Sequence, residues 1–274
     1  MKNETQKKRV QQFYDGLIYG CKASVETSLS MLRAFPYPTT DQLQALSVLE
    51  VGVGRGEWSV GLAAHARKYT GVDYSGKTVD YVRHEIASLA AQANDAVVVK
   101  GDVLTLTFED NSFDAAYCIG VLHATPDPER GFRELYRVLK PGGTLNMMLY
   151  GRVQPRNAIR DSAYQLSRLG ARAENWILRS AMWLERFKLS DTFLFNGDGN
   201  EVLYRDWYFA PIQSHHSIWE TSKWAKAIGG EVSYVFLDPY RDTLKRYKVW
   251  ARMPILRNFF CPDFMVSIKK LEVN

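Results

Sequence analysis

The chain has 274 residues, of which 46% are hydrophobic and 24% are charged, a balance typical of a globular protein rather than a disordered or fibrous one. Its net charge of +5 comes from basic residues interspersed with acidic ones, which favours an ordinary basic surface over a dedicated nucleic-acid surface. No apolar run approaches the roughly 20 residues that a helix needs to span a bilayer, and the basic N-terminus leads into no apolar signal segment. We therefore expect a cytoplasmic protein without a transmembrane segment, built as one large domain with an insertion or as two small domains.

Cysteine usage argues against a metal site. The three cysteines lie far apart and form no C-x-x-C pair, so neither a zinc site nor a disulfide framework is predicted. His123, His215 and His216 are suitable ligand types, but their spacing imposes no geometry, and we expect no bound metal.

The N-terminal segment, residues 4–35, predicts a helix because apolar residues recur along it at steps of three and four. Pro36 and Pro38 end it, because proline cannot continue a helix. Tyr14 and Tyr19 are candidates for substrate binding, although packing of the helix on the rest of the protein explains them equally well. The apolar positions of the segment are Val10, Phe13, Leu17, Cys21 and Val25.

A strand, a glycine-rich turn and a helix follow. Val48, Leu49, Val51 and Val53 form an apolar, β-branched run that predicts a buried strand. Three glycines then stand at alternate positions, and glycine lets the backbone turn tightly while a ligand lies against it. These glycines are Gly52, Gly54 and Gly56.

The turn does not match the dinucleotide pattern G-x-G-x-x-G/A. Its third small position falls on Glu57 or Ser59, depending on which glycine begins the pattern. Glu50, on the strand itself, would repel a pyrophosphate and suits a cationic ligand. The sequence therefore disfavours a dinucleotide site and favours a cationic ligand.

Acidic residues end the next two predicted strands. Residues 68–72 form the second strand, and Asp73 closes it, where a carboxylate can accept both ribose hydroxyls of a nucleoside. The third strand, 97–100, leads into Asp102. This continued alternation of strands and helices requires right-handed crossovers and predicts a parallel sheet. A fourth strand, a helix and a fifth strand follow at 115–119, 128–139 and 144–150.

The order and spacing of these pieces across residues 46–150 resemble the core of class I S-adenosylmethionine-dependent methyltransferases, in particular the small-molecule methyltransferases. The resemblance implies an α/β fold with a seven-stranded, mostly parallel, Rossmann-like sheet flanked by helices. It implies that Glu50 contacts the methionine moiety of S-adenosylmethionine, that Asp73 holds the ribose and that Asp102 lies near the adenine. The residues implied to bind this cofactor and its product, S-adenosylhomocysteine, are Glu50, Gly52, Gly54, Gly56, Asp73, Tyr74, Asp102, Val103, Ile119 and Gly120.

The rest of the chain departs from this alternation. Two helices are predicted at 156–169 and 173–189, and the resemblance implies that they form a helical cap over the active site. Residues 206–216 are interpreted as an aromatic, proline-broken and histidine-rich loop. Ser217 and Glu220 form a capping box at the start of the next helix.

Two further strands complete the expected sheet. They lie at 231–237 and 264–269, joined by a basic-aromatic connection at 238–263, and the resemblance implies that the last strand runs antiparallel beside the sixth. The expected units are an N-terminal helical lid (1–40), the cofactor-binding core (41–150), a helical cap insertion (151–205) and the C-terminal part of the core sheet (206–274).

The reaction implied is an in-line displacement at a sulfonium methyl, which depends mainly on alignment, so a general base is optional. Histidine is the usual base near neutral pH. We predict that one or more of His123, His215 and His216 orients or deprotonates the acceptor, against the alternative that they cap or pack. The residues expected to bind the acceptor are Tyr14, Tyr19, Trp207, Tyr208 and Gln213.

The acceptor class is inferred by exclusion. The fourth strand ends in Cys118-Ile119-Gly120-Val121, which lacks the Asn/Asp-Pro-Pro-aromatic motif of enzymes that methylate base amines. Cys118 lies in an apolar strand rather than beside a proline, so a cysteine-dependent cytosine enzyme is disfavoured. A small-molecule acceptor, methylated on O, N or S by a monomer or homodimer, is the main hypothesis, with no nucleic-acid partner expected. The alternatives are a quinone- or lipid-like acceptor at a membrane surface, an RNA methyltransferase, and a non-catalytic cofactor-binding module.

Overall fold

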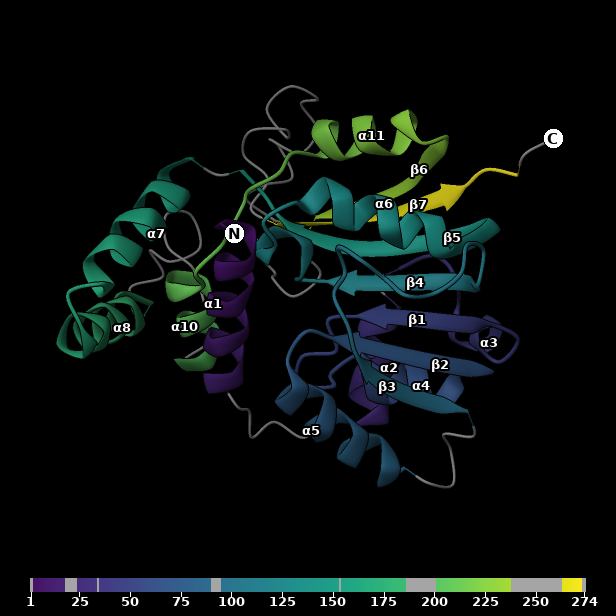
Figure 1. The fold of residues 1–274 in the computed structure, drawn as a ribbon, viewed down its shortest axis with the longest axis horizontal. Helices are drawn as coiled ribbons and strands as arrows, with labels where there is room; N and C mark the ends of the chain where they lie inside the picture. The colour runs from purple at the N-terminus through teal and green to yellow at the C-terminus, as the bar shows by residue number, and fades with distance from the viewer. Residues whose placement is uncertain are drawn as a thin grey trace.

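The computed structural model describes residues 2–17, 24–33, 35–89, 95–152, 154–185, 201–237 and 263–272. Its centre is a seven-stranded sheet with the order β3-β2-β1-β4-β5-β7-β6, in which β7 alone runs antiparallel to its neighbours (Figure 1). This confirms the predicted α/β class, including the reversed last strand. The strands are β1 (Ser47–Val51), β2 (Lys68–Asp73), β3 (Ala96–Lys100), β4 (Phe113–Ile119), β5 (Leu139–Tyr150), β6 (Gly230–Leu237) and β7 (Asp263–Lys270).

Helices cover both faces of the sheet because successive strand residues point to opposite sides. In β1, Val48 packs in the cluster with α2, α3, α4 and α5, whereas Leu49 packs in the cluster with α6 and α11. The helices are α1 (Lys2–Gly16), α2 (Val25–Leu32), α3 (Thr40–Leu43), α4 (Ser59–His65), α5 (Gly76–Ala87), η1 (Leu122–Ala124), α6 (Pro128–Val138), α7 (Gln154–Ser167), α8 (Ala171–Glu185), α10 (Glu201–Phe209) and α11 (Ile218–Ala227).

The predicted capping box at Ser217 is confirmed, and Ser75 caps the start of α5. The hydroxyl of Ser75 accepts the N–H of Thr78, and the Ser217 and Glu220 side chains form the expected capping box. In the part of the chain that the structure describes, no helix combines the length and the apolar character needed to cross a bilayer.

Two segments differ from the sequence-based expectation. Residues 4–35 do not form one helix, because α1 ends at Gly16 and α2 begins at Val25, where Ser24 caps a new first turn. Residues 206–209 are not loop but the end of α10, because their aromatic side chains are buried against α7 and α8 and no helix breaker precedes Pro211. Most of the expected connection at 238–263 lies outside the described residues.

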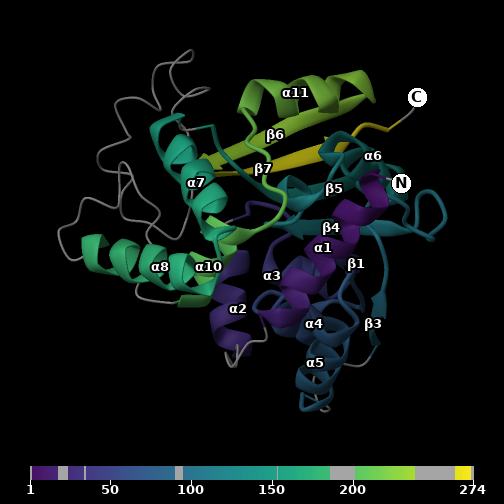
Figure 2. The ribbon, with the colours of Figure 1, turned by 60° about the vertical axis from the view of Figure 1, so that its left-hand side comes forward.

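A separate helical group adjoins the carboxyl ends of the strands. Helices α7, α8 and α10 share a buried cluster that includes Trp207 and Tyr208 and that meets the sheet at Tyr150. Arg160 of α7 ties the group together, since its guanidinium donates to the carbonyls of Trp207 and Ala210. Helix α1 stands between this group and the strand ends (Figures 1 and 2).

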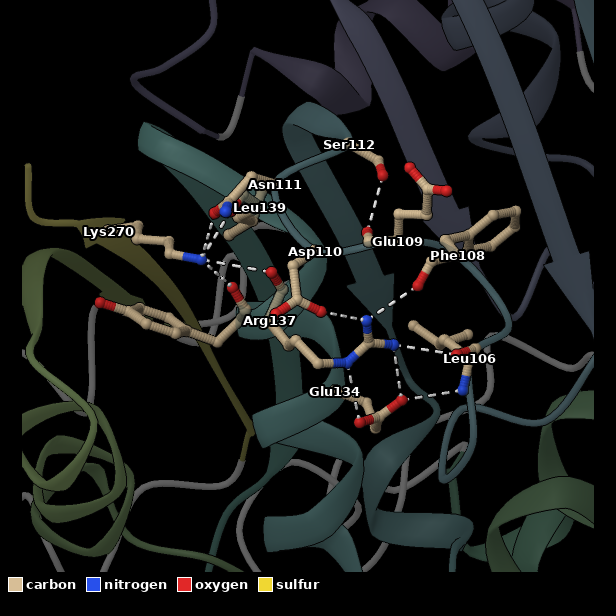
Figure 3. Close-up of polar contacts among 11 residues, drawn as sticks. Leu106, Phe108, Glu109, Asp110, Asn111, Ser112, Glu134, Arg137, Leu139 and Lys270 are labelled. Atoms are coloured by element: carbon tan, nitrogen blue, oxygen red, sulfur yellow. Dashed lines mark hydrogen bonds and ion pairs between the residues drawn. The ribbon is translucent and has the colours of Figure 1, made fainter.

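A polar network holds the loop after β3 to the end of α6 (Figure 3). The guanidinium of Arg137 donates to the carbonyls of Phe108 and Leu106 at 2.8 and 2.9 Å. Lys270 of β7 donates to the carbonyl of Leu139 at 2.7 Å, where α6 passes into β5. The network therefore fixes the loop between β3 and β4. None of the side chains described in it lines the cavity at the carboxyl ends of the strands.

Candidate functional site

A cavity of about 510 Å³ lies at the carboxyl ends of the parallel strands. It spans the point where β1 adjoins β4 and the strand order reverses, which is where ligands bind in open α/β sheets. Its size is that of a small-molecule site. Along the sheet, from β3 to β7, the cavity meets in turn Asp102, Asp73, Gly52, Gly120, Tyr150 and Asp263.

The glycine turn after β1 forms the middle of the cavity floor. Gly52 has a φ of +83°, and a Cβ there would lie 2.0 Å from a methyl carbon of Val121, so no other residue fits. Gly54 has a φ of +50° and lines the cavity, with no atom nearer than 4.0 Å to the place of a Cβ. The first glycine therefore lets the turn pack against the segment after β4, and the second leaves room for a ligand.

Asp73, at the end of β2, faces the cavity beside this turn. Its carboxylate accepts the N–H groups of Ser75 at 2.8 Å and of Gly54 at 3.3 Å. Burial raises the pKa of Asp73 to about 6, against the lowering effect of these hydrogen bonds. The side chain is thus held in place by the backbone at the position that sequence analysis assigned to a ribose contact.

Glu50 lies away from the cavity walls and is only 2% exposed. The hydroxyl of Tyr69 donates to its Oε2 at 2.5 Å, and burial raises the pKa of Glu50 to about 8. This raised pKa favours the protonated form of Glu50 in the folded protein. This differs from the expectation of a charged carboxylate beside the turn, because the sequence pattern did not show how deeply β1 is buried.

Asp102, after β3, closes one end of the cavity. Its Oδ2 lies 2.5 Å from the ammonium of Lys7 on α1, and its Oδ1 accepts the N–H of Leu104 at 2.9 Å. Helix α1 makes two further polar contacts around the cavity: Ser75 donates to Asp15, and Tyr14 donates to Asp206. These contacts fasten α1 across the cavity at three places.

The structure brings most of the expected binding residues to one cavity. Gly56 packs toward Val82 instead, and like Glu50 it is absent from the walls. Tyr19 lies outside the described residues. The expected residues that line the cavity are Gly52, Gly54, Asp73, Tyr74, Asp102, Val103, Ile119, Gly120 and Tyr14.

The three histidines do not line the cavity. His123 is buried and stacks on Tyr150 with ring centroids 3.7 Å apart, and burial lowers its pKa well below the usual value. His216 is buried, with Ser214 at 2.7 Å from its Nε2 and Glu220 at 3.3 Å from its Nδ1. His215 packs edge-on against Trp207.

The residues expected to bind the acceptor on this segment also do not line the cavity. Trp207 and Tyr208 are buried in the cluster with α7 and α8, and Gln213 is absent from the lining. The α10 residues that line the cavity are instead Val202, Leu203 and Asp206. The sequence did not indicate them, because Asp206 was interpreted as part of a loop and no helix was predicted at 201–205, whereas residues spaced by three and four share one face of a helix.

Lys7 and Asp263 were also missed. Lys7 sits in a basic run at the N-terminus that gave no sign of a partner, and Asp263 precedes a strand whose place beside β5 depends on the tertiary fold. Among the described residues, no three His, Cys, Asp or Glu side chains cluster as metal ligands would. Cys118 is buried in β4, and burial raises its pKa.

Residues 49–147 match a family described as "Methyltransferase domain". The chain therefore contains a class I, Rossmann-like S-adenosylmethionine-dependent methyltransferase domain. An S-adenosylmethionine-dependent methyltransferase of Methanosarcina mazei superposes with a TM-score of 0.55 at 19% identity, over 87% of this chain and 99% of that one. An S-adenosylmethionine-dependent methyltransferase of Mesorhizobium loti superposes with a TM-score of 0.54 at 17% identity, over 90% of this chain and 100% of that one. At these identities the likeness is one of fold.

Curated relatives match less than half of this chain. A sterol 24-C-methyltransferase of Aspergillus fumigatus is 35% identical over 38% of this chain and 28% of its own length. A chloroplastic 2-methyl-6-phytyl-1,4-hydroquinone methyltransferase of Oryza sativa is 34% identical over 40% and 32%. A demethylmenaquinone methyltransferase of Staphylococcus aureus is 33% identical over 36% and 41%. The matches thus span less than half the length of these relatives.

Proposed function

We propose that the protein transfers the methyl group of S-adenosylmethionine to a small-molecule acceptor bound in the same cavity. The observation that carries this proposal is a single cavity that runs from Asp102 past the glycine turn to Tyr150 and Asp206. Such a cavity has one end for a nucleoside and another for an acceptor. Membership of the methyltransferase fold class supports the nature of the cofactor.

The residues at the β1–β3 end fit S-adenosylmethionine. The open space at Gly54 allows a ligand to approach the backbone of the turn. The Asp73 carboxylate is placed to accept ribose hydroxyls, and Asp102 to accept an adenine amino group. Val103 and Ile119 supply apolar walls on either side. We propose these residues, together with Tyr74 and Gly120, as the cofactor-binding set.

S-adenosylmethionine supplies a methyl group already activated by a cationic sulfur, so the chain has mainly to align the acceptor and exclude water. Helix α1 lies across the cavity and is fastened at both ends of it, by Lys7 and by Tyr14. We therefore propose α1 as the functional part of the expected N-terminal lid. Because α10 lines the cavity and α7 and α8 hold α10, we propose this helical group as the cap.

In this proposal His123 does not contact the acceptor but supports a residue that lines the cavity. His123 stacks on Tyr150, whose hydroxyl lies 3.5 Å from Asp206, so His123 positions a residue that lines the cavity. Deprotonation of the acceptor by His215 or His216 stays a prediction, and it requires their side chains to reach the cavity.

A methyl-transfer assay tests the proposed function. The protein is incubated with S-adenosylmethionine carrying an isotope-labelled methyl group and a panel of small hydroxyl, amine and thiol compounds, and labelled products are identified by mass spectrometry. The proposal predicts a labelled product from at least one class and none from a Gly54→Val variant. Binding of S-adenosylhomocysteine by the wild type without transfer to any compound would favour the non-catalytic module.

A second candidate, a lipid-like acceptor taken from a membrane surface, is favoured by the exposed face of α8. Four exposed residues share one side of this helix, because they follow one another at steps of four, three and four. They are Arg172, Trp176, Arg179 and Trp183. Tryptophan and arginine together suit the interface of an anionic bilayer. The similarity to sterol and hydroquinone methyltransferases supports such an acceptor.

A vesicle flotation assay separates the two candidates. With vesicles of phosphatidylcholine and phosphatidylglycerol, the second candidate predicts that the wild type floats and that a Trp176→Ala, Trp183→Ala variant does not. Trp219→Ala is the matched control, since Trp219 is an exposed tryptophan on α11. Equal flotation of all three proteins, or no flotation of the wild type, would contradict a membrane-surface role for α8.

A further inference from the structure

A cluster of oxygen atoms occupies the end of the cavity remote from Asp102. The hydroxyl of Tyr14 on α1 donates to Oδ1 of Asp206 at 2.8 Å, and the hydroxyl of Tyr150 on β5 lies 3.5 Å from Oδ2. Asp263 of β7 lines the same end. This cluster joins a helix near the N-terminus, the fifth strand and α10, so it forms only in the folded protein.

The position of the cluster follows from the strand order. The two carboxylates assigned above to the nucleoside, Asp102 and Asp73, lie at β3 and β2, whereas Tyr150 and Asp263 lie at β5 and β7, beyond the β1–β4 switch point. A nucleoside held at β2 and β3 therefore leaves the Asp206 end for the second reactant. Met148 and Leu203 give this end apolar walls, so its polar contacts are few and specific.

Asp206 brings a carboxyl group to this end; burial raises its pKa, and the nearby guanidinium groups of Arg160 and Arg55 oppose that rise by favouring the carboxylate. Of the two basic side chains that line the cavity, Lys7 pairs with Asp102 and Arg55 pairs with Glu57. No described basic residue forms an ion pair with Asp206, whose hydrogen-bond partners are the hydroxyls of Tyr14 and Tyr150. A carboxylate has room for about four hydrogen bonds, so Asp206 can accept further ones from a ligand.

We propose that Asp206, aided by Tyr14 and Tyr150, is the acceptor subsite and holds the acceptor by its O–H or N–H group. The carboxylate attracts a neutral or cationic hydrogen-bond donor and repels an anion. The acceptors are accordingly hydroxyl or amine compounds, and compounds whose reactive group is a carboxylate or phosphate are excluded. This inference rests on the proposed methyltransferase function, because that function assigns the other end of the cavity to the cofactor.

The experiment uses three probes that share one aromatic ring: phenol, benzylamine and benzoate. Their binding to the protein saturated with S-adenosylhomocysteine is measured by ligand-observed NMR titration. The wild type is expected to bind phenol and benzylamine about tenfold more tightly than benzoate. Asp206→Asn removes the charge at nearly constant volume and is expected to reduce this preference to less than about threefold.

Two controls accompany this variant. Glu201→Gln removes an exposed carboxylate from the same helix and should leave the preference unchanged. Tyr14→Phe keeps the carboxyl group of Asp206 and removes one hydroxyl of the subsite, so phenol and benzylamine should bind more weakly but still more tightly than benzoate. Calorimetry with S-adenosylhomocysteine should give the wild-type affinity for Asp206→Asn and Glu201→Gln.

The outcomes separate the inference from the function on which it rests. Equal binding of benzoate to the wild type, an unchanged preference in Asp206→Asn, or no binding of phenol and benzylamine would overturn the subsite while S-adenosylhomocysteine still binds. Failure of the wild type to bind S-adenosylhomocysteine would instead overturn the proposed function.

Discussion

The ammonium of Lys7 lies 2.5 Å from Oδ2 of Asp102, although the two residues are 95 positions apart in the chain. Both side chains retain about a fifth of their exposure, 19% and 21%, and both line the cavity. The ion pair therefore connects α1 to the place where we propose that the adenine binds. A ligand that binds at Asp102 would therefore lie beside α1, which the ion pair holds at that end of the cavity.

The first prediction concerns Lys7→Met, which keeps the length of the side chain and removes its charge. Because the pair is partly exposed, its loss should weaken the closure of α1 by about 0.2–1 kcal/mol. S-adenosylhomocysteine should then dissociate about two- to fivefold faster in stopped-flow experiments. Lys8→Met, at an exposed neighbouring position, is the control and should dissociate at the wild-type rate. Equal rates for all three proteins would show that the ion pair does not restrain the lid.

The two glycines of the turn should respond differently to alanine. At Gly52 a Cβ would lie 2.0 Å from Val121, so Gly52→Ala should destabilise the fold by about 1–3 kcal/mol or more in urea denaturation. At Gly54 there is space, so Gly54→Ala should cost only the strain of a positive φ, about 1–2 kcal/mol. Gly54→Val should fold and lose S-adenosylhomocysteine binding in calorimetry. Tight binding by folded Gly54→Val would argue against a ligand at this turn.

The buried Glu50 should make stability depend on pH. In the folded protein Glu50 keeps its proton up to about pH 8, whereas the model value for a free glutamate is 4.5. The folded state therefore binds more protons between these values, so the stability contributed by this group is present below pH 4.5 and is lost as the pH rises toward 8.

Glu50→Gln lacks this titration and provides the comparison. Between about pH 5 and about pH 8.5, the free energy of unfolding of the wild type should fall relative to that of Glu50→Gln by an amount on the order of a few kcal/mol. Urea denaturation of both proteins at the two pH values measures the difference. Parallel stability curves would mean that Glu50 is charged in the folded protein.

Arg137 offers a test of the fold away from the cavity (Figure 3). Its guanidinium also contacts Glu134 and Asp110, besides the carbonyls of Leu106 and Phe108. Arg137→Met removes the donors and should lower the free energy of unfolding by about 1–3 kcal/mol. Arg133→Met is the control, because Arg133 forms one exposed ion pair with Glu129 on the same helix. Equal loss in both variants would contradict the structural role of Arg137.

The sequence was sufficient for features that depend on local pattern. The strand, glycine turn and helix around Gly52 and Gly54, the acids after β2 and β3, and the caps at Ser75 and Ser217 all have short-range signals in residue type and spacing. Their repetition along the chain also predicted the parallel sheet, whereas the one reversed strand was implied by the resemblance to class I methyltransferases. Cys118 is buried for a reason of the same local kind, since it lies in an unbroken apolar strand.

Features that depend on tertiary packing were missed. Histidine beside aromatic residues suggested a pocket, but the aromatic side chains of α10 pack onto α7 and α8 and leave Asp206 facing the cavity. The pairing of Tyr14 with Asp206 joins residues 192 positions apart, and no local pattern indicates it. Glu50 was expected to be charged because the sequence of β1 alone does not show that Tyr69, on the neighbouring strand, covers its carboxyl group.

Calorimetric titration with S-adenosylhomocysteine tests the central claim, that the cavity beside the glycine turn is a cofactor site, most directly. The wild type should bind one molecule per chain, and Asp73→Ala, whose carboxylate we propose to accept the ribose hydroxyls, should bind about ten- to a hundredfold more weakly while remaining folded. No binding by the wild type, or the same affinity in folded Asp73→Ala, would contradict the account.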